Sequence, residues 1–337
     1  MPGLIDPAAI FSPLAEYPRL GLAVSGGADS LALMLLAARY AQSPEARRRF
    51  IVYSVDHGLR PEAKDEVAFV VAEATKLGFQ ARALLWEGAK PESGLQQAAR
   101  QARYGLIGSA MRADKVPVLL TAHHLRDQAE TVLMRMAHGS GLEGLRGMDY
   151  FSVIEDVSIV RPLLGVEPDL LRQVVAEAGL TPVADPSNDD RDYERVRWRQ
   201  ALPLLAELGL DAERLGRFAL RVRDADAALE DFADQAFAEI ALSAVHGASF
   251  DRAWLAALPR AVAVRVVGRV LDLIGGGQKP HGLGAVENLT ERLLREPFKA
   301  TLHGCVVFSD GVVVRMEREP GRAAAAAARQ ASHHNRV

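Results

Sequence analysis

The chain has 337 residues, of which 49% are hydrophobic and 25% are charged. This composition is typical of globular proteins and excludes disorder over the whole length. The net charge of −3 excludes a uniformly basic protein, so any surface for nucleic acid must be a local basic cluster. Because Cys305 is the only cysteine, the chain cannot supply a disulfide framework, a cysteine-rich zinc module or the thiolates of an iron–sulfur cluster.

The N-terminal segment and the hydropathy pattern indicate whether the protein is secreted or spans a membrane. Met1–Asp6 has no basic stretch followed by an apolar core, so it does not resemble a signal peptide. No apolar run reaches the roughly 18 residues that span a bilayer. We therefore expect a cytoplasmic protein that does not associate with a membrane.

Short apolar runs alternate with amphipathic segments in the first half of the chain. These runs predict strands at Leu20–Val24, Phe50–Val55, Ala81–Leu85, Val116–Leu120 and Val157–Leu164. Helical spacing of apolar residues predicts helices at 30–41, 62–77, 95–113 and Pro168–Gly179. Strands and helices of these lengths in alternation predict an α/β fold, with a parallel sheet covered by helices on both faces.

The second half has a different character. Thr181–Arg191 is rich in Pro, Asp, Asn and Ser, which predicts a loop. Beyond it, helical spacing predicts helices at 211–242, 250–274 and 283–295. Two apolar runs flank Ser309-Asp310-Gly311, and Asp-Gly between such runs favours a hairpin. We therefore expect a mainly helical segment that ends in a small hairpin.

These changes in character define the expected domains. A chain of this length usually forms more than one hydrophobic core. We place a first domain at 1–210 and a second, helical α+β domain at 211–320. The alanine run and polar end of 321–337 predict a disordered tail.

A glycine turn lies between the first strand and the first helix, with the sequence Ser25-Gly26-Gly27-Ala28-Asp29-Ser30. At such a junction, unpaired backbone N–H groups and the helix dipole favour an anion, which predicts a phosphate site. The Asp29 carboxylate would repel a phosphate unless a cation lay between them, so we expect a bridging Mg²⁺. The alternative is a turn that only starts a helix. The turn lacks the Gly-Lys-Ser/Thr ending used for γ-phosphoryl transfer.

Polar residues follow two of the predicted strands. Asp56 and His57 come after the second strand, and His123 and His124 come after the fourth. Because the carboxyl ends of parallel strands meet at one edge of a sheet, we expect these residues to share a crevice with the glycine turn. A zinc site at the paired histidines is a rival interpretation, although no cysteine assists it. A purely structural role for His57 is also open.

Three residues downstream of the paired histidines have helical spacing. Asp127, Glu130 and Thr131 would lie on one face of a helix that starts near Leu125. On that face, Asp127 would share the cation with Asp29 or orient a nucleophile.

Arginines cluster in two places. Arg100 and Arg103 lie one helical turn apart, where a guanidinium would stabilise charge on a reacting phosphate. The second cluster combines arginines with aromatic residues, which suits RNA, and comprises Arg191, Tyr193, Arg195, Arg197, Trp198 and Arg199, continued by Arg214, Arg217 and Arg221. The alternative for both clusters is a solvated helix face.

Several motifs together resemble a known family. Ser-Gly-Gly-X-Asp-Ser after a first strand resembles the PP-loop of the N-type ATP pyrophosphatases, which cleave ATP between its α and β phosphates. The further motifs are Asp56–Arg60, Ala99–Tyr104, Ala122–Thr131, Gly139–Leu142, Arg161–Leu164, Asp185–Asn188, Arg195–Arg199 and Pro203. In this order they resemble the tRNA(Ile)-lysidine synthetases, over Leu20 to about Pro203. Two positions depart from the family pattern: Arg126 replaces an acidic residue and Val196 replaces an asparagine.

The resemblance implies an activity. The family uses ATP and Mg²⁺ to adenylate C2 of the wobble cytidine of tRNA(Ile) with a CAU anticodon, and free L-lysine then displaces AMP. It implies that the first domain is the catalytic, ATP-binding one and that the second domain binds tRNA. A homodimer is left open. The rival functions are a PP-loop tRNA thiolase, which normally needs more cysteines, and a catalytically silent RNA-binding relative.

The resemblance also implies roles for particular residues. The expected catalytic residues are Asp29, Asp127 and Arg103, and the Mg²⁺ ligands are Asp29 and Asp127. Asp127 is in addition the candidate base for the lysine amine. The expected ATP-binding residues are Ser25, Gly26, Gly27, Ala28, Asp29, Ser30, Asp56, His57 and His123. The expected tRNA-binding residues are Arg195, Arg197, Arg199 and Arg217, with Arg195 reaching the cytidine.

Overall fold

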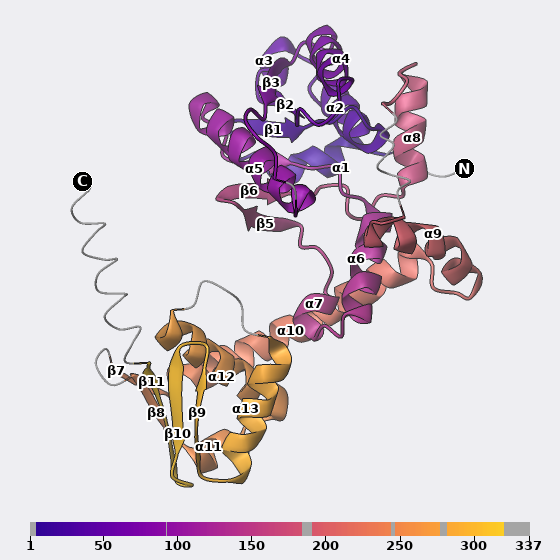
Figure 1. The fold of residues 1–337 in the computed structure, drawn as a ribbon. Helices are drawn as coiled ribbons and strands as arrows, with labels where there is room; N and C mark the ends of the chain where they lie inside the picture. Colours follow the sequence, from indigo (N-terminus) through magenta and orange to yellow (C-terminus); the bar gives the residue numbers. More distant parts are fainter. Residues whose placement is uncertain (1–4, 92, 184–190, 244–246, 277–281, 320–337) are drawn as a thin grey trace, which may run out of the picture. The chain divides into compact units, whose positions relative to one another are not determined.

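A computed structural model describes residues 5–91, 93–183, 191–243, 247–276 and 282–319 (Figure 1). The chain forms two compact units, which we describe separately. The first unit comprises Met1–Gly139 and Gly144–Leu220, and the second comprises Ser140–Glu143 and Arg221–Val337. Within the described segments, every helix is too short or too polar to cross a bilayer.

The first unit is built on a six-stranded sheet with the strand order β3-β2-β1-β4-β6-β5. The strands are β1 (Leu20–Ala23), β2 (Phe50–Asp56), β3 (Gln80–Leu85), β4 (Leu119–Leu120), β5 (Phe151–Ile154) and β6 (Val157–Val160). All neighbouring strands are parallel except β5, which pairs antiparallel with β6 at the edge. The carboxyl ends of β1, β2, β4 and β6 therefore lie along the same edge of the sheet.

Helices cover both faces of this sheet because its central strands are apolar on both sides. On β2, Phe50 and Val52 pack into the cluster formed by α2 (Ala28–Tyr40), α4 (Ala63–Lys76) and α8 (Pro168–Glu177). The alternate residues Ile51 and Tyr53 pack on the opposite face against α5 (Leu95–Asp114). Such two-sided burial is the usual arrangement of parallel sheets and confirms the predicted fold class.

A smaller helical layer completes the first unit. Here α6 (Leu125–Ala137) packs against α9 (Glu194–Glu207) and the start of α10 (Ala212–Ala238), around a cluster that includes Val132, Leu202 and Leu215. The remaining short helices of this unit are α1 (Pro7–Phe11), the 3₁₀ helix η1 (Ser12–Leu14) and α3 (Pro44–Arg47), whereas the short helix α7 (Leu142–Leu145) has residues in both units.

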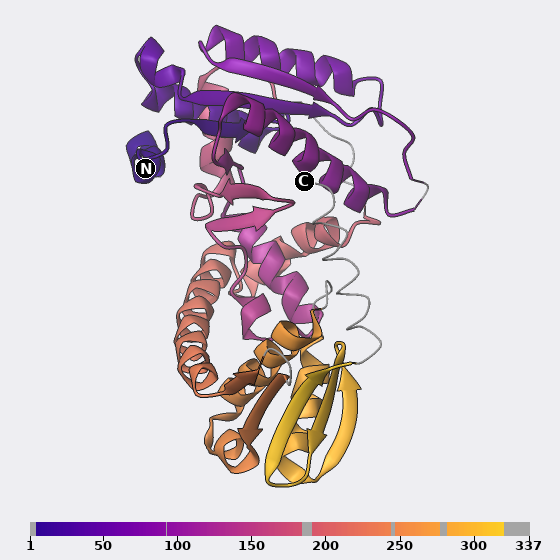
Figure 2. The same ribbon diagram turned by 90° about the vertical axis from the view of Figure 1, so that its left-hand side faces the viewer.

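The second unit contains an antiparallel sheet with the order β7-β8-β11-β10-β9, drawn in orange and yellow in Figure 2. Its strands are β7 (Ala241–Ser243), β8 (Gly247–Asp251), β9 (Phe298–Leu302), β10 (Cys305–Ser309) and β11 (Val313–Arg318). Its helices, besides the end of α10, are α11 (Arg252–Ala257), α12 (Arg260–Gly275) and α13 (Leu283–Arg295). One face of the sheet is buried against α12, through residues such as Val307 and Met316.

Most predicted elements of the first unit are confirmed, whereas the second unit differs. The helix predicted at 250–274 was wrong at its start, because Ala248 and Phe250 alternate inward on a strand and Pro259 separates two helices. The long helix ends at Ala238 instead of Leu242. The predicted hairpin is confirmed as β10 and β11, but it belongs to a five-stranded sheet. Most of the loop at 181–191 and the tail at 321–337 lie outside the described residues.

The close approach of α12 to the β9–β10 turn generates a stability prediction. A Cβ added at Gly275 would lie 1.9 Å from the backbone oxygen of His303, so Gly275→Ala must displace main chain. We expect the free energy of unfolding of the second unit to fall by about 1–3 kcal/mol, measured by urea denaturation. The control is Gly284→Ala on α13, where a Cβ meets nothing within 4 Å and the change should be neutral or stabilising. Equal destabilisation by both variants would contradict this account.

Candidate active site

The glycine turn joins β1 to α2 and is fastened by its own polar groups. The Ser30 hydroxyl donates to the Gly27 carbonyl oxygen at 3.0 Å and accepts from the Ser25 backbone N–H at 3.2 Å. Gly27 caps α2 without a side-chain hydrogen bond, so the first N–H groups of the helix have no side-chain cap. Those donors and the positive end of the helix dipole can receive an anion.

Gly26 has a backbone conformation that the turn requires. Its φ of +88° is in the left-handed region that favours glycine, and an added Cβ would lie 2.8 Å from the Val183 side chain. The Val183 N–H also donates to the Gly26 carbonyl oxygen at 2.9 Å. The turn is therefore held by a segment more than 150 positions downstream.

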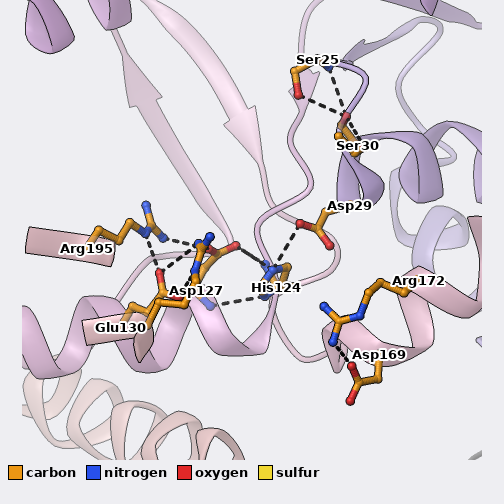
Figure 3. Close-up of polar contacts among 11 residues, drawn as sticks. Ser25, Asp29, Ser30, His124, Asp127, Glu130, Asp169, Arg172 and Arg195 are labelled. Atoms are coloured by element: carbon orange, nitrogen blue, oxygen red, sulfur yellow. Dashed lines mark hydrogen bonds and ion pairs between the residues drawn. The ribbon is translucent and has the colours of Figure 1, made fainter. Parts of the chain in front are cut away.

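Figure 3 shows that His124 lies between two carboxylates from different elements, Asp29 on α2 and Asp127 on α6. His124 Nε2 is 3.5 Å from an oxygen of each carboxylate. His124 also caps α6: its Nδ1 accepts from the Asp127 N–H at 3.3 Å, while Asp127 accepts from the His124 N–H at 3.0 Å. Because Nδ1 accepts a hydrogen bond, the imidazole proton is on Nε2 and faces the two acids.

Two arginines from α9 neutralise the acids of α6. Glu130 is fully buried, with 0% of its side chain exposed, and accepts from Arg195 Nε at 2.7 Å and from Arg199 Nε at 2.8 Å. Arg195 Nη2 also donates to Asp127 at 3.0 Å. Two guanidinium groups thus compensate two carboxylates, an arrangement that permits charges to be buried.

These charges decide the ionisation of Asp127. Burial raises the pKa of the carboxyl, but the neighbouring His124, the Arg195 guanidinium and the hydrogen bond from the His124 backbone N–H outweigh burial and lower the pKa below its ordinary value. Asp127 is therefore an ionised carboxylate at neutral pH.

The converging carboxylates fit a magnesium ion better than a zinc ion. The carboxylates of Asp29 and Asp127 both approach Nε2 of His124. Asp29 has 40% of its side chain exposed and Asp127 has 12%. Mg²⁺ is typically held by one or two carboxylates together with phosphate oxygens and water. Over the parts of the chain that the structure describes, no three His, Cys, Asp or Glu residues are grouped as metal ligands.

The other residues expected at the strand ends have local partners. Asp56 accepts from the Gly58 N–H at 2.7 Å, and His57 Nε2 lies 3.3 Å from Arg103 Nη2. His123 Nδ1 lies 2.9 Å from the Thr121 hydroxyl. Burial, with a smaller contribution from nearby arginines, lowers the pKa of His123 to about 4, so its imidazole is neutral at physiological pH.

The arginines expected to bind tRNA have different surroundings. Arg195 and Arg199 bind the acids of α6, as described above. Arg197 donates to the carbonyl oxygens of Arg191 and Asp192, and Arg217 pairs with Glu213 one turn away on α10. Sequence reasoning placed His124 in the predicted crevice and Glu130 on the same helix face as Asp127, but it gave neither residue a catalytic or ATP-binding role.

The chain is similar to known proteins. A family model described as a PP-loop domain matches residues 7–205. The chain is 38% identical to the tRNA(Ile)-lysidine synthase of Bradyrhizobium sp. strain BTAi1, over 93% of each chain. It is 41% identical to that of Methylobacterium nodulans, over 90% of this chain and 91% of the relative.

A solved structure shares the fold. The U34-tRNA thiolase NcsA from Methanococcus maripaludis, with its [4Fe-4S] cluster, aligns with 64% of this chain and 78% of its own, at a TM-score of 0.53 and 16% identity.

The buried Glu130 generates a stability prediction. Glu130→Gln removes the charge that both arginines contact, so we expect the free energy of unfolding to fall by about 1–3 kcal/mol in urea denaturation. The control is Glu213→Gln, which breaks an exposed pair with Arg217 and should change stability by less than about 0.5 kcal/mol. A Glu130→Gln variant as stable as the control would show that the buried cluster contributes little.

The lowered pKa of His123 predicts a pH dependence. Unfolded histidine binds a proton below about pH 6.5 whereas folded His123 does so only near pH 4, so its contribution to stability falls as pH drops through this window. His123→Gln should flatten the decline of unfolding free energy between pH 6.5 and 4, by about 3 kcal/mol at most. Parallel stability profiles of the variant and the wild type would refute the neutral buried imidazole.

Proposed function

This chain belongs to the tRNA(Ile)-lysidine synthase family, and from that premise we propose that it converts the wobble cytidine of tRNA(Ile) to lysidine. The tRNA carries a CAU anticodon, the activating nucleotide is ATP, and the protein acts in the cytoplasm. The observation that carries the proposal is the convergence of Asp29 and Asp127 beside a glycine turn that can bind phosphate.

The reaction has two steps. In the first, the O2 atom of the cytidine attacks the α-phosphorus of ATP, and the bond from that phosphorus to pyrophosphate breaks. In the second, the amine of lysine attacks C2, the bond from C2 to the AMP oxygen breaks, and the amine loses a proton. The products are lysidine, AMP and pyrophosphate.

The chain's own groups would support the first step. The turn at 25–30 offers backbone N–H groups to the phosphates, and the exposed Arg103 on α5 would stabilise charge on the α-phosphate. Asp56, His57 and His123 line the same edge of the sheet and would contact the nucleotide. Such fixed donors act without reorganisation when charge develops.

Asp29 and Asp127 would hold Mg²⁺, which when bound neutralises phosphate charge. The lowered pKa of Asp127 keeps it ionised, as a metal ligand must be, but makes it a weak proton acceptor. We therefore assign Asp127 first to the metal, and its role as base for the lysine amine second.

Recognition of tRNA would involve the arginines of α9 and α10. Arg195 is part-exposed and already bonded to Asp127 and Glu130, so contact with the cytidine would bring the base beside the metal ligands. Arg199 shares this position, whereas the exposed Arg197 and Arg217 are free of the buried acids and would meet the phosphate backbone.

The alternatives have weaker support. A thiolase with an iron–sulfur cluster needs several thiolates, but Cys305 is the only cysteine, and burial raises its pKa to about 11. A silent RNA-binding relative would not need both Asp29 and Asp127, and both are present at the site.

The decisive assay supplies the purified chain with tRNA(Ile) transcript, ATP and labelled lysine. We expect AMP, pyrophosphate and labelled tRNA in equal amounts, with the label at the wobble position. Formation of ADP, pyrophosphate release without tRNA, or AMP release without lysine would refute the proposal.

Asp29→Asn tests the metal role within that assay. We expect pyrophosphate release to fall by about 10²-fold or more, because the variant loses a carboxylate proposed to hold the Mg²⁺ at the phosphates. The affinity for tRNA should be nearly unchanged, because Asp29 is not among the residues expected to bind tRNA. Asp169→Asn on α8, an exposed acid distant from the turn in sequence, is the matched control and should retain wild-type turnover. Full turnover by Asp29→Asn would remove the metal role.

A further inference from the structure

Arg161 is a buried cation that the reaction described above does not use. It directly follows β6, and only 5% of its surface is exposed. Arginine remains charged in proteins, so its burial is costly unless a carboxylate or several acceptors compensate it.

The compensation that Arg161 receives is incomplete. Its Nη1 donates to the Asp149 carbonyl oxygen at 2.8 Å and to the Ser152 hydroxyl at 2.9 Å. Its Nε is buried without a hydrogen-bond partner, and the described residues provide no carboxylate within ion-pair distance. Both acceptors that it does have are neutral, so the charge itself is unmatched.

A second cation lies close to Arg161. Burial lowers the pKa of Arg161 and the charge of Arg100 lowers it further, whereas Tyr104 and Asp149 act in the opposite direction. Arg100 is exposed on α5, over the ring of Tyr104 at 5.1 Å from its centroid. The Asp149 carboxylate already pairs with Arg146 at 3.4 Å. The region therefore carries an excess of positive charge.

The position of Arg161 places this charge beside the candidate active site. Strand β6 neighbours β4, which leads into His123, and β4 neighbours β1, which leads into the glycine turn. All three strands are parallel, so Arg161 lies on the sheet edge that carries the site. The electrostatic influence of Arg161 and Arg100 on His123 agrees with this proximity.

We propose that Arg161, together with Arg100, forms a subsite for an oxyanion group of a reactant. A guanidinium with unused N–H donors matches the planar fork of a carboxylate or two oxygens of a phosphate. The identity of the ligand rests on the proposed function, whose reactants offer this chemistry in two sources: the pyrophosphate portion of ATP and the carboxylate of free lysine.

Isothermal titration calorimetry of the full chain tests the subsite with two probes. One is pyrophosphate with Mg²⁺. The other is L-lysine, measured with Mg²⁺ and an ATP analogue whose α–β bridging oxygen is a methylene group. Cadaverine, which is lysine without its carboxylate, separates recognition of the carboxylate from recognition of the amines.

Arg161→Met should weaken binding of one probe by about ten- to one-hundredfold and leave the other unchanged. Loss of lysine binding, with cadaverine affinity equal in variant and wild type, assigns the subsite to the carboxylate. Loss of pyrophosphate binding assigns it to the phosphates. Arg172→Met, an exposed arginine of α8 paired with Asp169, is the matched control and should bind both probes normally.

Arg161→Lys keeps the charge without the planar fork, and it decides the matter if Arg161→Met does not fold. We expect it to bind the affected probe about tenfold more weakly than the wild type. Unchanged affinity for both probes in either folded variant would overturn the subsite. Because these titrations need no turnover, absence of lysidine formation alongside an Arg161-dependent affinity would refute the proposed function and leave the subsite standing.

Discussion

Compensation of buried carboxylates at the start of α6 is the constraint on which the site depends. Glu130 has no solvent to stabilise its charge, so it requires the two guanidinium groups of α9. Arg195, one of these two arginines, also donates to Asp127. His124 lies against Asp127 as well and caps α6. Asp127, the acid proposed to hold the metal, is thus oriented by His124 at the start of α6 and by Arg195 on α9.

This arrangement changes the meaning of the basic cluster near residue 195. Arginines interleaved with aromatic residues suggest an RNA surface, but two of them, Arg195 and Arg199, donate hydrogen bonds to carboxylates of the protein itself. An arginine held in this way is preorganised, because its rotamer is fixed before a ligand arrives. The arrangement therefore allows Arg195 to serve both as a structural counterion and as a contact for the reacting base.

Much of the first unit could be predicted from the sequence because its signals are local. Apolar runs such as Phe50–Val55 are buried on both faces, and Ser25–Ser30 carries its glycines and serines in one contiguous turn. The pairing of Glu130 with Arg199 could not be predicted, since 69 positions separate them and either residue type suits a solvated face. The second unit was harder because β8 is short and contains glycine and alanine, and only its pairing with β7 and β11 reveals it as a strand.

The hydrogen bond from Val183 to Gly26 has a consequence for biosynthesis. The glycine turn proposed to bind the nucleotide emerges early from the ribosome, but Val183, which donates a hydrogen bond to it, emerges only after some 150 further residues. The nascent chain therefore lacks this contact at the proposed phosphate site until nearly all of the first unit has been translated. A truncated product that stops before Val183 would lack this hydrogen bond to the turn.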